Sequence, residues 1–546
     1  MQLTEYLKHH TVYLDGGMGT LLQQKGLQAG EASESWNLTH PQEITAIHKA
    51  YFDAGTNVVA ANTFGANALK YSDERLEALI AAAVENAKRA KAESQAPQEK
   101  WIALDIGPTG RLLCPFGDLD FEKAVTVFQK TVTLGVKYGV DLILIETMSD
   151  LLETKAAVLA AKAACDLPIL VSNAYSENGR LMTGADPQIM VAMLESLGVD
   201  AIGVNCSFGP KQLGGVVREY LKYASLPVLL KPNAGLPQMI DGKNVYTVSP
   251  TEFAGDVSAL MRDGVRLAGG CCGTTPDHIK ALVDESKALA LPCADKKSAT
   301  VVTSRTRAVT LDGEPILIGS GIDPTQSDDI CDALREGDTE SLLDEAMAQQ
   351  DEEIQALRVN VSLEDTNEKE LLTAAVGELQ TMIDLPLLLD TADLAAMEGA
   401  LRRYNGKALV GPVNGSVQGA VLLSLVKKYG GCALVRTANE YGVPETAEER
   451  VEIADKICVL AQELGMEKTD LVFMPVAASD PCDEAALLAV RLLCKRGCKT
   501  LLPISGQDAE NGTFHRALAN GLSAAIVDPY CKEIQHTYHE FLKQNN

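Results

Sequence analysis

Residues 265–274 carry the sequence Val-Arg-Leu-Ala-Gly-Gly-Cys-Cys-Gly-Thr, in which an apolar run ends in glycines and two adjacent cysteines. Residues 201–206, Ala-Ile-Gly-Val-Asn-Cys, repeat this order of apolar run and cysteine. Short, nearly continuous apolar runs are typical of buried parallel strands. We therefore expect Cys206, Cys271 and Cys272 at the carboxyl ends of two strands.

Six other apolar runs in the first half of the chain have the same form, and a stretch with helical periodicity follows each of them. Eight strand–helix units in fewer than 300 residues favour a closed (β/α)8 barrel of the TIM type. In such a barrel the reactive residues lie at the carboxyl ends of the strands, around one mouth. The eight predicted strands are 11–17, 57–64, 102–107, 141–147, 168–174, 201–207, 227–233 and 265–271.

A polar stretch at residues 292–312 interrupts this rhythm, and the second half of the chain then resumes it. The sequence thus predicts an α/β fold with two (β/α)8 TIM-type barrels in tandem. We expect a first domain at 1–292, a linker at 293–314 and a second domain at 315–546. The predicted strands of the second barrel are 315–321, 356–362, 386–391, 407–413, 432–438, 470–477, 499–506 and 524–530.

The composition of the 546-residue chain disfavours a role on nucleic acid or on a membrane surface. Its formal net charge is −26, whereas such roles need basic patches. No uncharged apolar run is long enough to cross a bilayer, and the first ten residues do not have the form of a secretion signal. Thirteen cysteines scattered over a chain of this length favour reduced thiols. We therefore expect a cytoplasmic protein with neither nucleic acid nor membrane as a partner.

Three cysteines at one barrel mouth predict a zinc site. Zn²⁺ favours thiolate ligands, and a catalytic zinc has three protein ligands and an open fourth position. Three thiolates give the complex a net charge of about −1, which suits it to binding a substrate thiol as a nucleophilic thiolate and points to alkyl transfer to sulfur. The alternative is that Cys271 and Cys272 are small apolar residues beside a tight turn.

Two other strand ends offer groups that suit an amino acid. The turn at residues 15–20, Asp-Gly-Gly-Met-Gly-Thr, lacks the spacing of a nucleotide-binding loop. Asp15 and the amides of Gly16, Gly17 and Thr20 could instead hold the zwitterionic end of an amino acid, and Glu146 could pair with its ammonium group. The alternatives are a turn that needs glycine for its conformation and a carboxylate that is solvated or caps a helix.

With these motifs in place, the first half of the chain resembles the homocysteine S-methyltransferase family. The resemblance covers about residues 1–290 and rests on the 15–20 turn, on Asn205-Cys206 and on the Gly-Gly-Cys-Cys-Gly-Thr run at 269–274. It implies homocysteine as the substrate and zinc as the cofactor. It assigns zinc ligation to Cys206, Cys271 and Cys272, amino-acid binding to the 15–20 turn and Glu146, and the fourth metal position at rest to Asn233.

The order of the two halves narrows the resemblance to the amino-terminal half of cobalamin-dependent methionine synthase, whose second module binds 5-methyltetrahydrofolate. Motifs of that module are similar to residues 356–361, 387–391 and 440–450. The resemblance implies folate binding by Asn360, Asp390 and Asn414. However, residues 319–323 read Gly-Ser-Gly-Ile-Asp where that module has Gly-Glu-Arg-x-Asn. The alternative is therefore a second barrel that binds a different ligand or docks a partner.

The sequence thus predicts a zinc-dependent methyltransferase that converts homocysteine to methionine. The expected methyl donor is a methyl-corrinoid, 5-methyltetrahydrofolate, or both in succession. Because the chain ends at Asn546, without the length for a cobalamin module, we expect a separate corrinoid protein as partner. Two alternatives stay open: a small direct donor such as betaine or S-methylmethionine, and a non-catalytic zinc-containing subunit that serves assembly.

Overall fold

All eight apolar runs predicted as strands in the first half of the chain take part in one parallel sheet. The computed structural model describes residues 2–28, 30–240, 243–290, 296–476 and 482–545. The sheet order is β1-β10-β7-β6-β5-β4-β3-β2. The strands are β1 (Val12–Tyr13), β2 (Val58–Ala60), β3 (Trp101–Ile106), β4 (Leu142–Met148), β5 (Ile169–Asn173), β6 (Ala201–Asn205), β7 (Val228–Lys231) and β10 (Leu267–Ala268).

The first and last strands of this order meet and close the sheet into a barrel. Leu14 forms a parallel bridge with Val58, and the Asn57 N–H donates to the Tyr13 carbonyl across 2.7 Å. Because all eight strands are parallel, their carboxyl ends lie around one mouth.

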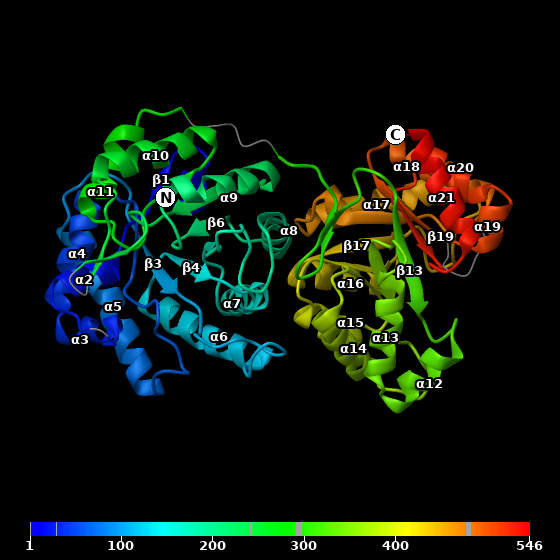
Figure 1. Ribbon diagram of the computed structural model, residues 1–546, viewed down its shortest axis with the longest axis horizontal. Helices are drawn as coiled ribbons and strands as arrows, with labels where there is room; N and C mark the ends of the chain where they lie inside the picture. The colour runs from blue at the N-terminus through cyan, green and yellow to red at the C-terminus, as the bar shows by residue number, and fades with distance from the viewer. Residues whose placement is uncertain (1, 29, 241–242, 291–295, 477–481, 546) are drawn as a thin grey trace. The chain divides into compact units, whose positions relative to one another are not determined.

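Helices follow the strands and cover the outside of the first barrel (Figure 1). Their starts use ordinary capping chemistry, since Asp120 and Asp186 accept hydrogen bonds from the first turns of α6 (Phe121–Tyr138) and α8 (Pro187–Leu197). The other helices are α2 (Met18–Gln24), α3 (Trp36–Thr39), α4 (Pro41–Asp53), α5 (Asp73–Glu93), α7 (Leu151–Ala164), α9 (Pro210–Tyr223), α10 (Pro250–Asp263) and α11 (Pro276–Ser286).

The amino-terminal helix α1 (Leu3–Leu7) covers the amino-terminal end of the first barrel. Leu3 and Leu7 belong to the same buried cluster as the strand residues Val12 and Leu229. Arg266, which precedes β10, donates from Nη2 to the Leu7 carbonyl. The opposite mouth, at the carboxyl ends of the strands, carries the candidate site.

The second half of the chain forms a closed barrel in which strands adjacent in sequence are adjacent in the sheet. The prediction of two (β/α)8 barrels in tandem is therefore confirmed. The strands are β13 (Ile316–Ile322), β14 (Ala356–Val359), β15 (Leu387–Asp390), β16 (Ala408–Val413), β17 (Gly431–Arg436), β18 (Leu471–Met474), β19 (Lys499–Ile504) and β20 (Ala524–Val527).

Helices surround the second barrel as well (Figure 1). They are α12 (Asp328–Glu336), α13 (Thr339–Gln350), α14 (Glu368–Met382), α15 (Leu394–Arg403), α16 (Val417–Tyr429), α17 (Ala447–Glu463), α18 (Glu484–Lys495), α19 (Gly506–Glu510), α20 (Thr513–Ala519) and α21 (Lys532–Asn545). In the described parts of the chain, no helix combines the length and the apolar content that a bilayer crossing requires.

Two short antiparallel hairpins lie outside the predicted strands. One joins β8 (Gln238–Ile240) to β9 (Lys243–Val245) after β7. The other joins β11 (Val301–Thr303) to β12 (Ala308–Thr310) within the segment predicted as a linker. The Thr303 N–H donates to the Lys407 carbonyl, just before β16, across 2.8 Å. This hairpin belongs to the second of the two compact units, Met1–Lys297 and Ser298–Asn546.

Several observed strands end before their predicted ends. β6 ends at Asn205, one residue before Cys206. β18 ends at Met474, and Ala477, the last residue of the corresponding predicted strand, lies outside the described residues, as do residues 293–295 of the predicted linker.

Candidate metal and amino-acid site

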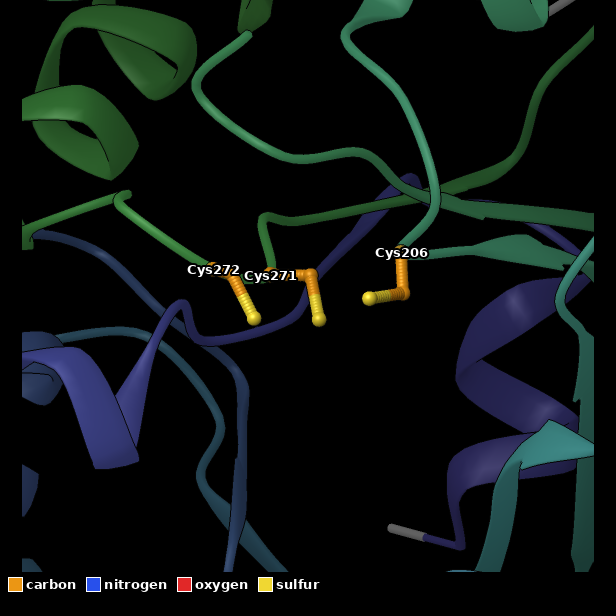
Figure 2. A group of neighbouring side chains, drawn as sticks. All are labelled: Cys206, Cys271 and Cys272. Atoms are coloured by element: carbon orange, nitrogen blue, oxygen red, sulfur yellow. The ribbon is translucent and has the colours of Figure 1, made fainter. Parts of the chain in front are cut away.

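The structure brings Cys206, Cys271 and Cys272 together at the carboxyl mouth of the first barrel. Their Sγ atoms all lie within 4.8 Å of one another. Figure 2 shows the three side chains extending into a common space from two separate loops, one after β6 and one after β10. The three residues therefore offer three sulfur ligands to a single ion.

The backbone at Cys206 adopts an uncommon conformation. Cys206 and Ser207 have φ values of 58° and 57°, in the left-handed region that costs a residue with a side chain about 1–2 kcal/mol. Two backbone hydrogen bonds hold this turn, from the Cys206 N–H to the Lys231 carbonyl at 3.0 Å and from the Phe208 N–H to the Cys206 carbonyl at 2.7 Å. Backbone outliers of this kind cluster at functional sites.

The loop of Cys271 and Cys272 is fixed mainly by the loop that follows β7. The Cys271 N–H donates to the Pro232 carbonyl at 2.8 Å, and the Cys272 N–H donates to Asn233 Oδ1 at 3.0 Å. Asn233 also lies close enough to Cys206 to lower the pKa of its thiol through a hydrogen bond. The structure thus places Asn233 between the cysteines, where its assignment to the fourth metal position stays a prediction.

The three thiols differ in how readily they lose a proton. Hydrogen bonds with Cys271 and then Cys272 lower the pKa of Cys206 to about 3. The hydrogen bond with Cys206 is also the main cause that raises the pKa of Cys272 to about 11, and it raises the pKa of Cys271 well above its ordinary value. The cluster therefore favours a thiolate at Cys206 that accepts hydrogen bonds from two thiols. A cation bound by all three sulfurs would replace those hydrogen bonds.

Tyr246, just beyond β9, also contacts the cysteine loop. Burial and the nearby charge of Cys272 raise the pKa of its phenol. Gly273, with φ of 79°, leaves room for the ring, because a Cβ at this position would lie 2.1 Å from Tyr246 Cγ. The sequence gives no signal for this contact, because it depends on the unpredicted hairpin of β8 and β9.

The glycine turn at residues 15–20 packs against the cysteine loop. The Gly17 N–H donates to Thr274 Oγ1 at 3.1 Å, and the Gly273 N–H donates to Thr20 Oγ1 at 3.3 Å. A Cβ at Gly16 would lie 2.5 Å from Thr274 Oγ1, so the two loops approach too closely for any side chain there. Gly16, Gly17 and Thr20 thus position the cysteines, and their predicted role in holding the substrate stays a prediction.

Asp15 and Glu146 both pair with a buried lysine. Lys231 Nζ lies 2.7 Å from Glu146 Oε2 and 3.4 Å from Asp15 Oδ1, and Lys231 is only 2% exposed. The second oxygen of Asp15 accepts the Ala60 N–H at 2.8 Å. Glu146 thus already pairs with an ammonium group of the chain, and the binding of a substrate ammonium by Glu146 and Asp15 stays a prediction.

Burial and charge oppose each other in this cluster. Burial alone would lower the pKa of Lys231, but Glu146 and Asp15 raise it well above its ordinary value, so the ammonium form persists. Burial raises the pKa of Asp15 to about 6, although Lys231 acts in the opposite direction. No local pattern predicts this role for Lys231, because Glu146 is 85 residues away and the two residues meet only when the barrel closes.

The second barrel has a cavity of about 500 Å³ among residues at the carboxyl ends of its strands. Of the three predicted folate residues, Asp390 lines this cavity. Asn360 Oδ1 instead accepts the Ser362 N–H at 2.9 Å, and Asn414 Oδ1 accepts the hydroxyl of Ser416 at 2.6 Å. These two asparagines hold local turns, as asparagine commonly does.

Asp390 is itself engaged by a buried arginine. Arg358 donates from Nε to Asp390 Oδ2 at 2.6 Å and from Nη1 to Asp323 Oδ2 at 2.7 Å. Burial would lower the pKa of Arg358, but Asp390 and Asp323 raise it. Folate binding by Asn360, Asp390 and Asn414 stays a prediction.

The fold and the first mouth together define a class of protein: a TIM barrel with three thiols gathered at its carboxyl end beside a buried lysine and its carboxylates. The chain belongs to the homocysteine S-methyltransferase family, whose model matches residues 12–286.

Relatives match more of the chain than this one barrel. It is 29% identical over 488 residues to the methionine synthase of Mycobacterium leprae and 28% identical over 479 residues to that of Mycobacterium tuberculosis. Each match covers 83% of this chain and 40% of the relative, so the chain spans less than half the length of these relatives. A solved structure, the metallated homocysteine methyltransferase MmuM from Escherichia coli, is 24% identical with a TM-score of 0.44, and the match covers 51% of this chain and 97% of that one.

Proposed function

We propose that this chain transfers a methyl group to the thiol of homocysteine, forming methionine, with zinc held by Cys206, Cys271 and Cys272. The observation that carries the proposal is the three-sulfur cluster, with all Sγ atoms within 4.8 Å, inside the region that matches the homocysteine S-methyltransferase family. The relatives named methionine synthase, which match 83% of the chain, support methionine as the product.

The donor set of the cluster suits zinc. Thiolate is a preferred zinc ligand, and three protein ligands leave a fourth position for a substrate. Hydrogen bonds with Cys271 and then Cys272 lower the pKa of Cys206, which favours a thiolate ligand at this position. When bound, zinc lowers the pKa of a substrate thiol and leaves its sulfur nucleophilic.

The residues beside the cysteines suit the amino-acid end of homocysteine. Asp15 and Glu146 lie at the same mouth, and Lys231 holds both carboxylates in fixed positions. Fixed positions matter because a bound substrate reacts fastest when its reacting atom is already oriented toward the methyl donor.

The proposed methyl donor is a methyl-corrinoid carried by a corrinoid protein or domain. The resemblance of both halves of the chain to cobalamin-dependent methionine synthase supports this choice. 5-Methyltetrahydrofolate is the proposed source of the methyl group if the cavity that Asp390 lines binds it.

The test is an assay of the full-length, zinc-loaded chain with L-homocysteine and free methylcobalamin, in which methionine is measured by mass spectrometry. We expect methionine to form, and to stop forming after treatment with a chelator. Parallel reactions contain 5-methyltetrahydrofolate, S-methylmethionine or betaine. If methionine forms with S-methylmethionine or betaine as the sole methyl donor, that compound replaces the methyl-corrinoid as the proposed donor. Binding of homocysteine without turnover on any donor would contradict catalysis and favour a zinc-containing assembly subunit.

A further inference from the structure

Asp105, at the carboxyl end of β3, is a buried carboxylate that the site as described does not use. It is 8% exposed, and its Oδ1 atom has no hydrogen-bond partner among the described residues. Its backbone is fixed by Thr63, whose hydroxyl donates to the Asp105 carbonyl at 2.8 Å. A buried acceptor without a donor is costly, so Asp105 Oδ1 is suited to a donor that arrives with a ligand.

Asp105 lies close enough to the cluster around Lys231 to interact with its charges. Burial raises the pKa of Asp105 well above its ordinary value, and Glu146, Asp15 and Glu34 raise it further, whereas Lys231 lowers it. These four charged groups are therefore close enough to Asp105 to affect its ionisation. Glu34 is held by a hydrogen bond from the Gly65 N–H.

The two carboxylates expected to bind a substrate ammonium already have partners. Lys231 pairs with Glu146 at 2.7 Å and with Asp15 at 3.4 Å, and the second Asp15 oxygen accepts the Ala60 N–H. One ammonium, that of Lys231, interacts with three carboxyl groups, Asp15, Asp105 and Glu146. A second ammonium at this group would relieve the repulsion that helps to raise the pKa of Asp105, and Asp105 has an oxygen without a hydrogen-bond donor among the described residues.

We propose that Asp105 binds the α-ammonium group of the substrate amino acid, and that it makes the first barrel selective for thiols that carry a free amino group. Lys231 holds Glu146 and Asp15 in place and cancels part of their charge. The arriving ammonium donates to the carboxylate of Asp105 and favours its ionised form. This inference rests on the proposed function, because it names the part of homocysteine that Asp105 recognises.

The test compares two thiols that differ only in the amino group. L-Homocysteine and 4-mercaptobutanoate, its des-amino analogue, are titrated by calorimetry into the zinc-loaded full chain and into Asp105→Asn. In the wild type we expect homocysteine to bind at least about 10-fold more tightly, since a hydrogen bond between charged groups is worth about that much. In Asp105→Asn we expect homocysteine to bind about 10- to 100-fold more weakly, with the affinity for 4-mercaptobutanoate unchanged.

Two further variants guard against a general structural effect. Asp105→Ser removes the carboxylate with a smaller side chain, and we expect the same loss of selectivity with an unchanged zinc content. Asp200→Asn is the matched control, because Asp200 is another aspartate whose pKa burial raises but it precedes β6, at the opposite end of the barrel. We expect this variant to keep the wild-type affinities for both thiols.

The outcomes separate this inference from the proposed function. If the wild type binds and methylates homocysteine while Asp105→Asn keeps the full selectivity, the role of Asp105 is overturned and the proposed function stands. If Asp105→Asn binds both thiols more weakly by the same factor and keeps a normal zinc content, the role of Asp105 in ammonium recognition is overturned. A wild type that binds neither thiol overturns both proposals.

Discussion

The two barrel mouths are built on the same plan and differ in which polar group is left unpaired. In the first barrel, Lys231 pairs with Asp15 and Glu146, and Asp105 keeps an oxygen without a donor. In the second, Arg358 pairs with Asp323 and Asp390. There an atom without a hydrogen-bond partner among the described residues is a donor, Nε of Arg436, and Arg436 also lines the cavity.

The two barrels share a fold, so the difference between their sites lies in the residues at the strand ends. Both mouths hold a buried cation between two carboxylates, so the pair alone does not identify a function. The first mouth adds three thiols and an unpaired acceptor, which suit a metal-bound thiol with an ammonium group. The second adds a donor and a cavity of about 500 Å³, which suit a different ligand.

The largest expected effect comes from removing one thiol of the first mouth. In Cys272→Ser we expect the bound zinc to fall well below one per chain, and methyl transfer to fall more than about 1,000-fold, since a three-ligand site loses a ligand. Metal analysis and methionine formation measure the two effects. The matched control is Cys165→Ser, because the thiol of Cys165 lies at the end of α7 and donates to the Ala161 carbonyl. Normal zinc content and turnover in Cys272→Ser would contradict the metal assignment.

The next effect compares the two buried cations. Lys231→Met leaves Asp15, Asp105 and Glu146 without their counter-charge, and we expect it to lower the free energy of unfolding of the first barrel by about 3–5 kcal/mol. Arg358→Met should cost the second barrel less, because the side chain of Asp390 is 18% exposed and water can solvate it.

Urea unfolding reports these two losses separately. The two tryptophans of the chain, Trp36 and Trp101, both lie buried in the first barrel, so their fluorescence follows that barrel alone. Hydrogen exchange of β13 to β20 follows the second. Equal losses in both barrels would contradict the expectation that water compensates Asp390 for the loss of Arg358.

A smaller expected effect is a pH dependence of the stability of the first barrel, caused by one buried histidine. His48, in α4, is fully buried, and neither ring nitrogen has a hydrogen-bond partner among the described residues. Burial lowers its pKa to about 4, whereas in the unfolded chain it titrates near its ordinary value of about 6.5. Between these values the unfolded state binds a proton that the folded state excludes, so His48 destabilises the folded barrel as the pH falls.

Replacement of His48 separates its contribution to the pH dependence of the unfolding free energy from the contribution of the carboxylates. Between pH 7 and pH 5, we expect the wild type to lose about 2 kcal/mol more unfolding free energy than His48→Leu. Burial raises the pKa of Asp15 to about 6, which acts in the opposite direction but equally in both proteins. Tryptophan fluorescence in urea measures the difference, and His9→Gln, at an exposed position, is the control. If the difference in unfolding free energy between the wild type and His48→Leu is the same at pH 7 and pH 5, the claim that folding excludes a proton from His48 is wrong.

The smallest expected effect concerns the second mouth. Asp390 already accepts a hydrogen bond from Arg358, so we expect Asp390→Asn to weaken binding of 5-methyltetrahydrofolate less than about 10-fold, or about 1.4 kcal/mol. Calorimetric titration of the full chain measures this change, with Glu252→Gln on the surface of the first barrel as the control. A loss of more than 100-fold would show that Asp390 carries pterin recognition. No binding by the wild type would assign the cavity to another ligand.

The architecture was predictable from the sequence because buried parallel strands leave a strong signal. Each of the sixteen predicted strands overlaps a strand of one of the two barrels. The hairpins of β8 with β9 and β11 with β12 escaped prediction, because their residues do not form near-continuous apolar runs like those of the barrel strands. The second of these hairpins lies where the polar composition predicts a linker.

The candidate site was predictable in part, for physical reasons. Cys206, Cys271 and Cys272 each follow an apolar run, so strand ends alone place them together. The pairing of Lys231 with Glu146 depends on barrel closure over 85 residues, and no local pattern encodes it. Asn360 and Asn414 resemble ligand residues in sequence, but each accepts a hydrogen bond from a serine two positions further on.

The left-handed turn at Cys206 and Ser207 has a consequence for how the protein matures in a cell. The turn is held by hydrogen bonds to the strand ends, such as the one from the Cys206 N–H to the Lys231 carbonyl, and the cysteine pair is held in the same way by Pro232 and Asn233. Folding of the barrel therefore sets the positions of the thiols, in contrast to small domains whose folding requires the ion. For the proposed zinc enzyme, we therefore expect cells starved of zinc to accumulate folded, inactive chains, and zinc resupply to restore activity without new protein synthesis.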